Sequence, residues 1–223
     1  MYWILFISIA LISWLVSYSL ERKFKRYQQV LLPLTGHDIA VRMLRENGID
    51  DVQVTCIPGQ LTDHYNPATK TVNLSEAVYQ GANIAAAAVA AHECGHALQH
   101  ATAYAPLRMR SALVPVVSFA SNWVMWILLI GMLVINTFPH LMLFGIILFA
   151  MTTLFSIITL PVEVNASQRA VAWLRSTGIT DNHTTEMASD ALRSAAYTYV
   201  VAALSSLATL IYYILIFLGG NRR

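Results

Sequence analysis

Long apolar runs alternate with polar segments along this chain. The first run, YWILFISIALISWLVSYSL, covers residues 2–20, and the last covers about residues 198–218. Between them, no Asp, Glu, Lys or Arg occurs from Ser111 to Val162, and the NTFPH sequence at 136–140 predicts a turn inside this stretch. Because about 20 helical residues cross a bilayer, the pattern predicts four transmembrane helices.

The first run is predicted to remain in the protein as an anchor. It lacks the basic leader and the small-residue cleavage site of a secretory signal peptide, and it is longer than such a peptide's apolar core. The basic cluster ERKFKR at residues 21–26 ends it.

The polar segment after the first run begins with an amphipathic helix. In TGHDIAVRMLRENGID, Thr35 and Asp38 have the spacing of a capping box, and Gly48 suits the left-handed position that ends a helix. The same segment ends in an alanine-rich helix, for which Asn83 is a suitable N-cap.

Short strands are expected between these two helices. DVQVTCI at 51–57 alternates between apolar and polar positions, as a half-buried strand does. LTDHYNPATKTVNLS at 61–75 predicts a hairpin around the NPATK turn. The second polar segment contains LPVEVNASQRAVAWLRSTG, which predicts a helix opened by Pro161 and closed by Gly178.

The chain is therefore expected to be a mainly α membrane protein with a small α+β module. We expect five parts, namely transmembrane helix 1 (1–20), a catalytic segment (21–110), transmembrane helices 2 and 3 (111–160), a second polar segment (161–197), and transmembrane helix 4 with the tail (198–223).

Composition supports a membrane protein and excludes some functions. Hydrophobic residues make up 57% of the chain and charged residues 12%, about half the charged share of soluble domains. A net charge of +2 gives no indication of nucleic-acid binding. Two cysteines, Cys56 and Cys94, are too few for a disulfide framework or a cysteine-rich zinc site.

The positions of lysine and arginine predict the orientation. All of the fourteen basic residues except Arg222 and Arg223 fall within residues 21–110 and 163–193. Because basic loops stay on the cytoplasmic side, both polar segments are expected in the cytoplasm.

The alanine-rich helix contains HECGH, an HExxH motif. His92 and His96 are four residues apart, so on a helix both imidazoles lie on one face and can bind one ion. Imidazole suits Zn²⁺, and Glu93 could take a proton from a zinc-activated water as general base. The motif is short and also arises by chance in proteins that are not enzymes.

A third ligand is needed, and the residues leave several candidates open. Glu163 is favoured because it is the first charged residue after the long uncharged stretch, where an acid without a partner is costly. The alternative is an ordinary acid favoured by a helix N-terminus. His100 would give HExxHxxxH, which is not the metzincin spacing. The other candidates are His64, Asp63 and Asp181.

These motifs resemble those of known membrane metalloproteases. HECGH followed by ExxA[DS]xxA, matched by Glu163, Ala166, Ser167 and Ala170, resembles HtpX-like heat-shock proteases and CAAX prenyl proteases. Together, LTDHYNPATKTVNLS, AAHECGHALQH and LPVEVNASQRA are more similar to the bacterial putative neutral zinc metallopeptidase membrane family, a gluzincin type, along nearly the whole chain.

The resemblance implies a ligand set and a substrate strand. It implies His92, His96 and Glu163 as zinc ligands, Glu93 as base, and a zincin-like module of short β-hairpin, HExxH helix and Glu-bearing helix. Ser167 stands where HtpX-like proteases carry Asp, so it cannot supply a carboxylate to orient a ligand histidine. The strand at 61–66, with substrate-binding residues His64, Tyr65 and Asn66, would pair with an extended substrate; a hairpin that merely packs is the alternative.

Peptide hydrolysis by such a protease passes through a tetrahedral intermediate, whose oxyanion needs a hydrogen-bond donor. The sequence does not choose among five candidates, which are His64, Tyr65, Arg169, Tyr197 and Tyr199. For the last two, anchoring at the bilayer edge is the favoured role.

The function expected is that of a membrane-embedded zinc metalloendopeptidase. It would lie in the bacterial cell membrane as a multi-pass protein, with its site at the cytoplasm–membrane boundary, and would cleave a peptide or membrane-protein substrate. An intramembrane protease of the site-2 kind would need an Asp ligand in a later span, and none of the runs contains one. A non-catalytic zinc-stabilised scaffold or chaperone is the alternative. Metal transport is disfavoured, because the runs hold no Asp, Glu, Lys or Arg.

Overall fold

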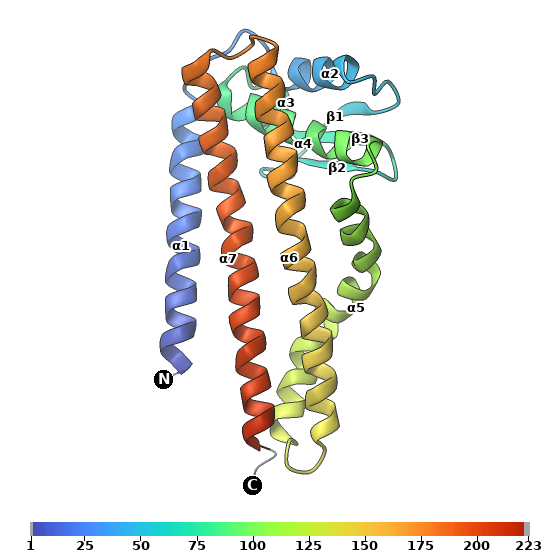
Figure 1. The fold of residues 1–223 in the computed structure, drawn as a ribbon. Coiled ribbons are helices and arrows are strands. Elements are labelled where there is room, and N and C mark those ends of the chain that lie inside the picture. Colours follow the sequence, from blue (N-terminus) through green and yellow to red (C-terminus); the bar gives the residue numbers. More distant parts are fainter. Residues whose placement is uncertain (1, 221–223) are drawn as a thin grey trace. The chain divides into compact units, whose positions relative to one another are not determined.

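The computed structural model describes residues 2–220 and is mainly helical (Figure 1). These residues form two compact units. One, here called the helical unit, consists of residues 2–9, 105–161 and 199–220; the other, the mixed unit, consists of residues 10–104 and 162–198.

The helical unit contains the apolar parts of three long helices, α5 (Ala105–Leu133), α6 (Pro139–Ser176) and α7 (Asn182–Gly220). All three are long and apolar enough to cross a membrane, and at most 28% of the most apolar stretch of each is buried. Side chains that stay exposed on such apolar helices suit a lipid environment. The last three predicted spans are thus confirmed as helices of this kind, and the chain is a membrane protein.

The first apolar run does form a helix, α1 (Tyr2–Tyr27). Within residues 2–220, however, the helices that qualify as candidate spans are α5, α6 and α7. Four spans are therefore not confirmed, and a membrane-spanning α1 stays a prediction. The predicted orientation relies partly on Arg222 and Arg223, which lie outside the described residues.

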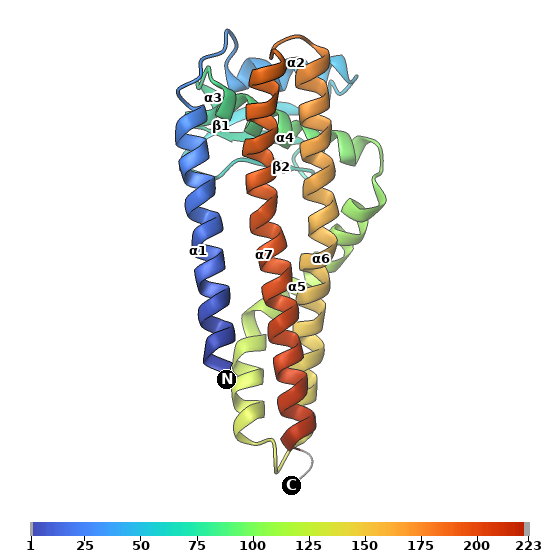
Figure 2. The same cartoon turned by 60° about the vertical axis from the view of Figure 1, so that its left-hand side comes forward.

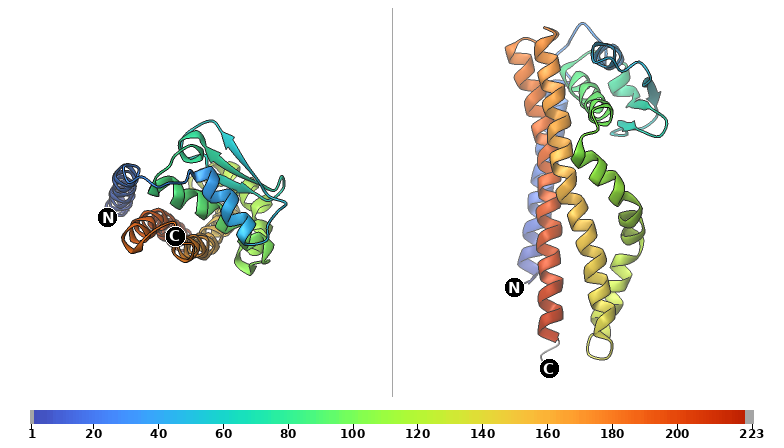
Figure 3. Two further views of the ribbon diagram at one scale, coloured as in Figure 1. Left: turned by 90° about the horizontal axis from the view of Figure 1, so that it is seen from above. Right: turned by 45° about the vertical axis from the view of Figure 1, so that its right-hand side comes forward.

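The prediction that Pro161 opens a separate helix is wrong. The expected turn between α5 and α6 is visible in the right-hand view of Figure 3, but α6, which begins at Pro139, continues through Pro161 to Ser176. Proline inside an apolar helix is tolerated because neighbouring groups and local adjustments satisfy the freed backbone carbonyl. At the other end the prediction is confirmed, since Gly178 has a left-handed φ of +66°.

The mixed unit begins after α1 with α2 (Gly36–Glu46). Its capping box is present: the Asp38 amide donates to Thr35 Oγ1 at 3.2 Å, and the Thr35 amide donates to Asp38 Oδ2 at 3.1 Å. Gly48 follows with a φ of +68°. The predicted helix is confirmed at both ends.

Three strands form one small sheet in the order β1-β3-β2. β1 (Gln53–Ile57) runs parallel to β3 (Thr71–Ser75), and β2 (His64–Asn66) pairs antiparallel with β3, with Tyr65 opposite Val72. The predicted hairpin is confirmed, and β2 is an edge strand. A short helix, α3 (Glu76–Tyr79), follows β3.

The centre of the mixed unit is α4 (Ile84–Ala101), which α2, α3 and the sheet surround (Figure 2). The side chain of Asn83 caps it by accepting from the Ala86 amide at 2.9 Å, as the sequence predicts. Its alanines between positions 85 and 97 are almost fully buried, so neighbouring elements can approach its backbone closely. Larger side chains complete this core, among them Ile39, Met43, Leu74, Ile84 and Leu174.

Candidate metal centre

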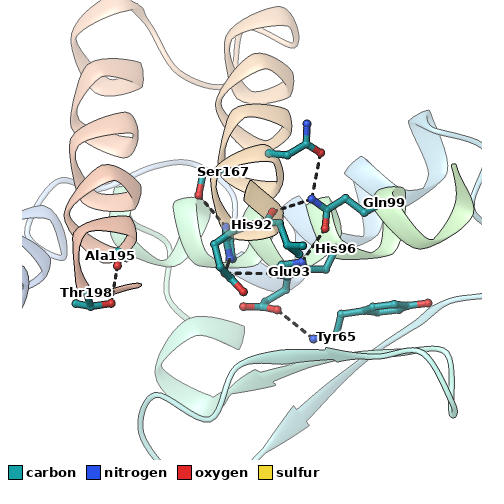
Figure 4. A network of polar contacts seen from close by, with 11 residues as sticks. Tyr65, His92, Glu93, His96, Gln99, Ser167, Ala195 and Thr198 are labelled. Atoms are coloured by element: carbon teal, nitrogen blue, oxygen red, sulfur yellow. Dashed lines mark hydrogen bonds and ion pairs between the residues drawn. The ribbon is translucent and has the colours of Figure 1, made fainter. Parts of the chain in front are cut away.

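Three residues from two helices converge within the mixed unit. His92 and His96 lie on α4 and Glu163 on α6, and their ligand atoms are all within 4.8 Å of one another. The Nε2 atoms of His92 and His96 are 3.2 and 3.5 Å from the same Glu163 oxygen, Oε2. The two rings stand edge to face with centroids 4.8 Å apart (Figure 4).

Close helix packing brings Glu163 to the histidines. Gly95, between the two histidines, lies against the backbone of Ala166, three residues after Glu163. A Cβ atom at Gly95 would be 2.6 Å from the Ala166 carbonyl oxygen, closer than real Cβ contacts. The glycine of HECGH therefore permits the approach of α6 that places Glu163.

Glu93 points from α4 toward the sheet. Its Oε2 accepts a hydrogen bond from the Tyr65 backbone amide at 3.0 Å, and the residue is 8% exposed (Figure 4). Tyr65 is in the edge strand β2. The predicted base and the predicted substrate strand are thus in direct contact.

The outer partners of the two histidines include a residue that the sequence reasoning missed. His92 Nδ1 lies 3.1 Å from Ser167 Oγ, and His96 Nδ1 lies 3.0 Å from Gln99 Oε1. Gln99 is fully buried. Its position three residues after His96 on one helix, and so on the same face, was the signal available.

The other ligand candidates have different partners. His100 Nδ1 lies 3.0 Å from the Tyr65 hydroxyl, and His64 Nδ1 lies 2.7 Å from the Thr62 carbonyl oxygen. Asp63 accepts from the Ser75 amide at 2.7 Å. Asp181 accepts from the Thr184 amide at 2.7 Å, at the start of α7. Among residues 2–220, none of these four joins the cluster.

The oxyanion candidates stay predictions. Tyr65 directs its hydroxyl to His100, and Arg169 Nε donates to Asn165 Oδ1 at 2.8 Å. Tyr197 is 52% exposed and Tyr199 37% exposed.

The surroundings of His96 favour positive charge. Burial lowers the pKa of His96, but the hydrogen bond with Glu163, the charges of Glu93 and Glu163, and the Gln99 contact together raise it above its ordinary value. An environment that stabilises an imidazolium also stabilises a cation bound there. Cys94 takes no part, because it is fully buried and burial raises the pKa of its thiol.

The donor set fits a zinc ion. Two imidazole nitrogens and one carboxylate oxygen are typical ligands of Zn²⁺, and catalytic zinc sites have three protein ligands with one position open. The three residues are largely buried, with side-chain exposures of 15%, 12% and 5% for His92, His96 and Glu163. A carboxylate and two imidazoles gathered at such depth need a partner charge or a metal.

Comparisons with known proteins agree with this chemistry. The chain is 42% identical over 221 residues to the protein named "Putative membrane protease YugP" of Bacillus subtilis (strain 168), and the match covers 97% of each chain. No solved structure matches the chain. The model of the family described as "Putative neutral zinc metallopeptidase" matches residues 2–218. The chain belongs to this family.

Proposed function

We propose that the protein is a membrane-embedded zinc metalloendopeptidase, with His92, His96 and Glu163 as ligands and Glu93 as general base. The observation that carries the proposal is the convergence of the three ligand atoms beside a carboxylate that contacts the sheet edge. Family membership supports the peptidase class and the choice of zinc.

A zinc ion held by these residues would polarise the scissile carbonyl and lower the pKa of water nearby. Glu93 follows His92 in α4, and its carboxylate is oriented by the Tyr65 amide at 3.0 Å. It takes a proton from the attacking water and then delivers that proton to the leaving amine.

The edge strand β2 positions the substrate. In the register of β2 with β3, Tyr65 lies opposite Val72, while the Tyr65 amide points to Glu93. The free side of β2 therefore faces the base, and an extended peptide could add there as a further strand. His64, Tyr65 and Asn66 are the substrate-binding residues of this proposal.

The number of converging ligands favours catalysis over a structural zinc site. Structural zinc sites are closed by four protein ligands. In the described part of the chain, the cluster contains three. A zinc-stabilised scaffold or chaperone would need neither the Glu93 carboxylate nor its contact with the edge strand β2.

The site is proposed to face the cytoplasm close to the membrane. Glu163 is the first Asp, Glu, Lys or Arg residue of α6, whose apolar part precedes it. The basic residues gathered in the two polar segments support the cytoplasmic side. Substrates would then be peptides or membrane proteins that expose an extended segment near the bilayer surface.

The Glu93→Gln variant tests the proposal. Glutamine has the same shape and can still accept from the Tyr65 amide, but it cannot take a proton from water. We expect peptide hydrolysis to fall by at least about 100-fold, the lower range for general-base catalysis, while the zinc content stays at one per chain. Hydrolysis at the wild-type rate in the zinc-loaded variant would refute the assignment of the base.

A further inference from the structure

Gln99 is a fully buried amide that uses both ends of its side chain. Its Oε1 lies 3.0 Å from His96 Nδ1. Its Nε2 donates to the Val162 carbonyl at 2.8 Å and to Asn165 Oδ1 at 3.1 Å. One side chain therefore connects a proposed zinc ligand on α4 to the backbone of α6 immediately before Glu163 (Figure 4).

Arg169 determines which group donates and which accepts in each of the hydrogen bonds that link it to His96. A guanidinium can only donate, so the Asn165 atom that faces Arg169 Nε at 2.8 Å must be the amide oxygen. That oxygen also contacts Gln99, so the Gln99 atom facing it must be the NH₂ group. The Gln99 oxygen is then left for His96, and it can only accept.

This order determines which nitrogen of His96 carries a proton. Because Gln99 Oε1 accepts, His96 Nδ1 must donate. Nε2, which faces Glu163 at 3.5 Å, then offers its lone pair to a cation. The corresponding partner of His92 is Ser167, whose hydroxyl can donate or accept and so imposes no tautomer.

We propose that Gln99 is a positioning residue of the zinc site, oriented by Asn165 and Arg169. It holds His96 in the tautomer and ring orientation that bind metal, and it ties α6 at Val162 so that Glu163 meets the histidines. This inference rests on the proposed zinc site but concerns metal binding rather than catalysis. The outer partners of both histidines, Ser167 and Gln99, are neutral.

The first test is Gln99→Met in the full-length protein in detergent. Methionine has a similar volume but makes none of the three contacts. We expect Co²⁺ affinity, followed by the visible absorption of the bound ion, to fall about 10- to 100-fold, the usual loss for an outer partner of a ligand histidine. We also expect a changed absorption spectrum in the loaded variant, because His96 can rotate. Thr102→Val, at the C-cap of α4, is the matched control, because the Thr102 hydroxyl donates to the backbone carbonyl oxygens of Leu98 and Gln99.

A second pair of variants at Asn165 separates orientation from packing. Asn165→Asp keeps oxygens that accept from Gln99 and Arg169, whereas Asn165→Leu fills a similar volume without an acceptor. We expect wild-type Co²⁺ affinity and spectrum in the first and a several-fold weaker affinity in the second. A purely structural role would make the leucine variant at least as good as the aspartate variant, and that result would overturn the proposal. This pair decides the matter if Gln99→Met fails to fold.

The outcomes distinguish this inference from the proposed function. A folded Gln99→Met protein with wild-type Co²⁺ affinity and spectrum would overturn the inference alone. A wild-type protein that binds Co²⁺ and Zn²⁺ but cleaves no peptide would overturn the proposed function alone. A wild-type protein that binds neither ion would overturn both.

Discussion

Glu163 Oε2 lies 3.2 Å from His92 Nε2, although 71 residues separate the two positions along the chain. The same oxygen lies 3.5 Å from His96 Nε2. An acid on one helix thus reaches both imidazoles of another, and the proposed metal site depends on this meeting.

Removing the Glu163 carboxylate is expected to remove most zinc binding. We expect Glu163→Ala to lower zinc affinity by more than about 100-fold, beyond the loss typical for outer partners, because one of three ligands is missing. Equilibrium dialysis with zinc analysis measures this. His100→Ala is the control, since His100 contacts the Tyr65 hydroxyl and not the cluster. Equal zinc binding in wild type and Glu163→Ala would show that this carboxylate is not a ligand.

Adding a methyl group at Gly95 is expected to separate α4 from α6. The new Cβ would meet the Ala166 carbonyl oxygen at 2.6 Å and its Cα at 3.1 Å, and backbone atoms cannot rotate away. We expect Gly95→Ala to cost about 1–3 kcal/mol of stability, the usual range for overpacking, and to weaken zinc binding. Thermal unfolding and zinc titration test both effects. Gly219→Ala, where a Cβ meets nothing within 4 Å, should change neither.

Zinc is expected to stabilise the folded protein through linkage. A ligand that binds only the folded state at 100 times its Kd adds about 2.7 kcal/mol, so the wild-type Tm should rise with zinc and fall again with a chelator. Differential scanning calorimetry at several zinc concentrations measures the shift. In Glu163→Ala the shift should largely disappear. A wild-type Tm that is independent of zinc would contradict the site.

The capping box of α2 is expected to give a pH-dependent contribution to stability. Hydrogen bonds from Thr35 hold the pKa of Asp38 below its ordinary value, so the folded state favours the ionised carboxyl. This stabilisation is present above the unfolded pKa of about 3.9 and is lost as the pH falls through the lower folded pKa. We expect Asp38→Ala to cost no more than about 1 kcal/mol at pH 7, because the side chain is 48% exposed.

Unfolding curves of wild type and Asp38→Ala between pH 7 and the acid limit of folding provide the measurement. The difference between the two proteins should shrink toward the acid end of the range. If the stability difference between the two proteins is the same at all pH values, the ionised Asp38 carboxylate is not its cause.

The native cysteines can test the proposed orientation. Cys56 on β1 is exposed, whereas Cys94 in α4 is fully buried. If the mixed unit faces the cytoplasm, a membrane-impermeant maleimide should label Cys56 in inside-out vesicles and not in intact cells. Cys56→Ser should abolish the labelling and so serves as the control. Labelling of intact cells would place this unit on the outer side.

Local sequence patterns predicted the elements of the mixed unit well. The capping box of Thr35 and Asp38, the Asn83 cap and the hairpin that ends at Ser75 all involve residues close in sequence. Such contacts depend on short-range geometry, which residue types alone largely determine. Pro161 misled the prediction because its preference for a helix start is also compatible with the interior of a long apolar helix.

The sequence by itself determined the apolar helices and the HExxH pair on one helical face. Its long uncharged stretch, together with the family resemblance, indicated Glu163 as the third ligand. Only the tertiary structure decided that Glu163 meets the histidines, that Glu93 contacts Tyr65, and that Gln99 contacts His96. Helical periodicity relates residues three or four positions apart. Contacts between α4 and α6 span more than sixty residues, and they exist because Gly95 and the buried alanines let two helix backbones approach at one particular register.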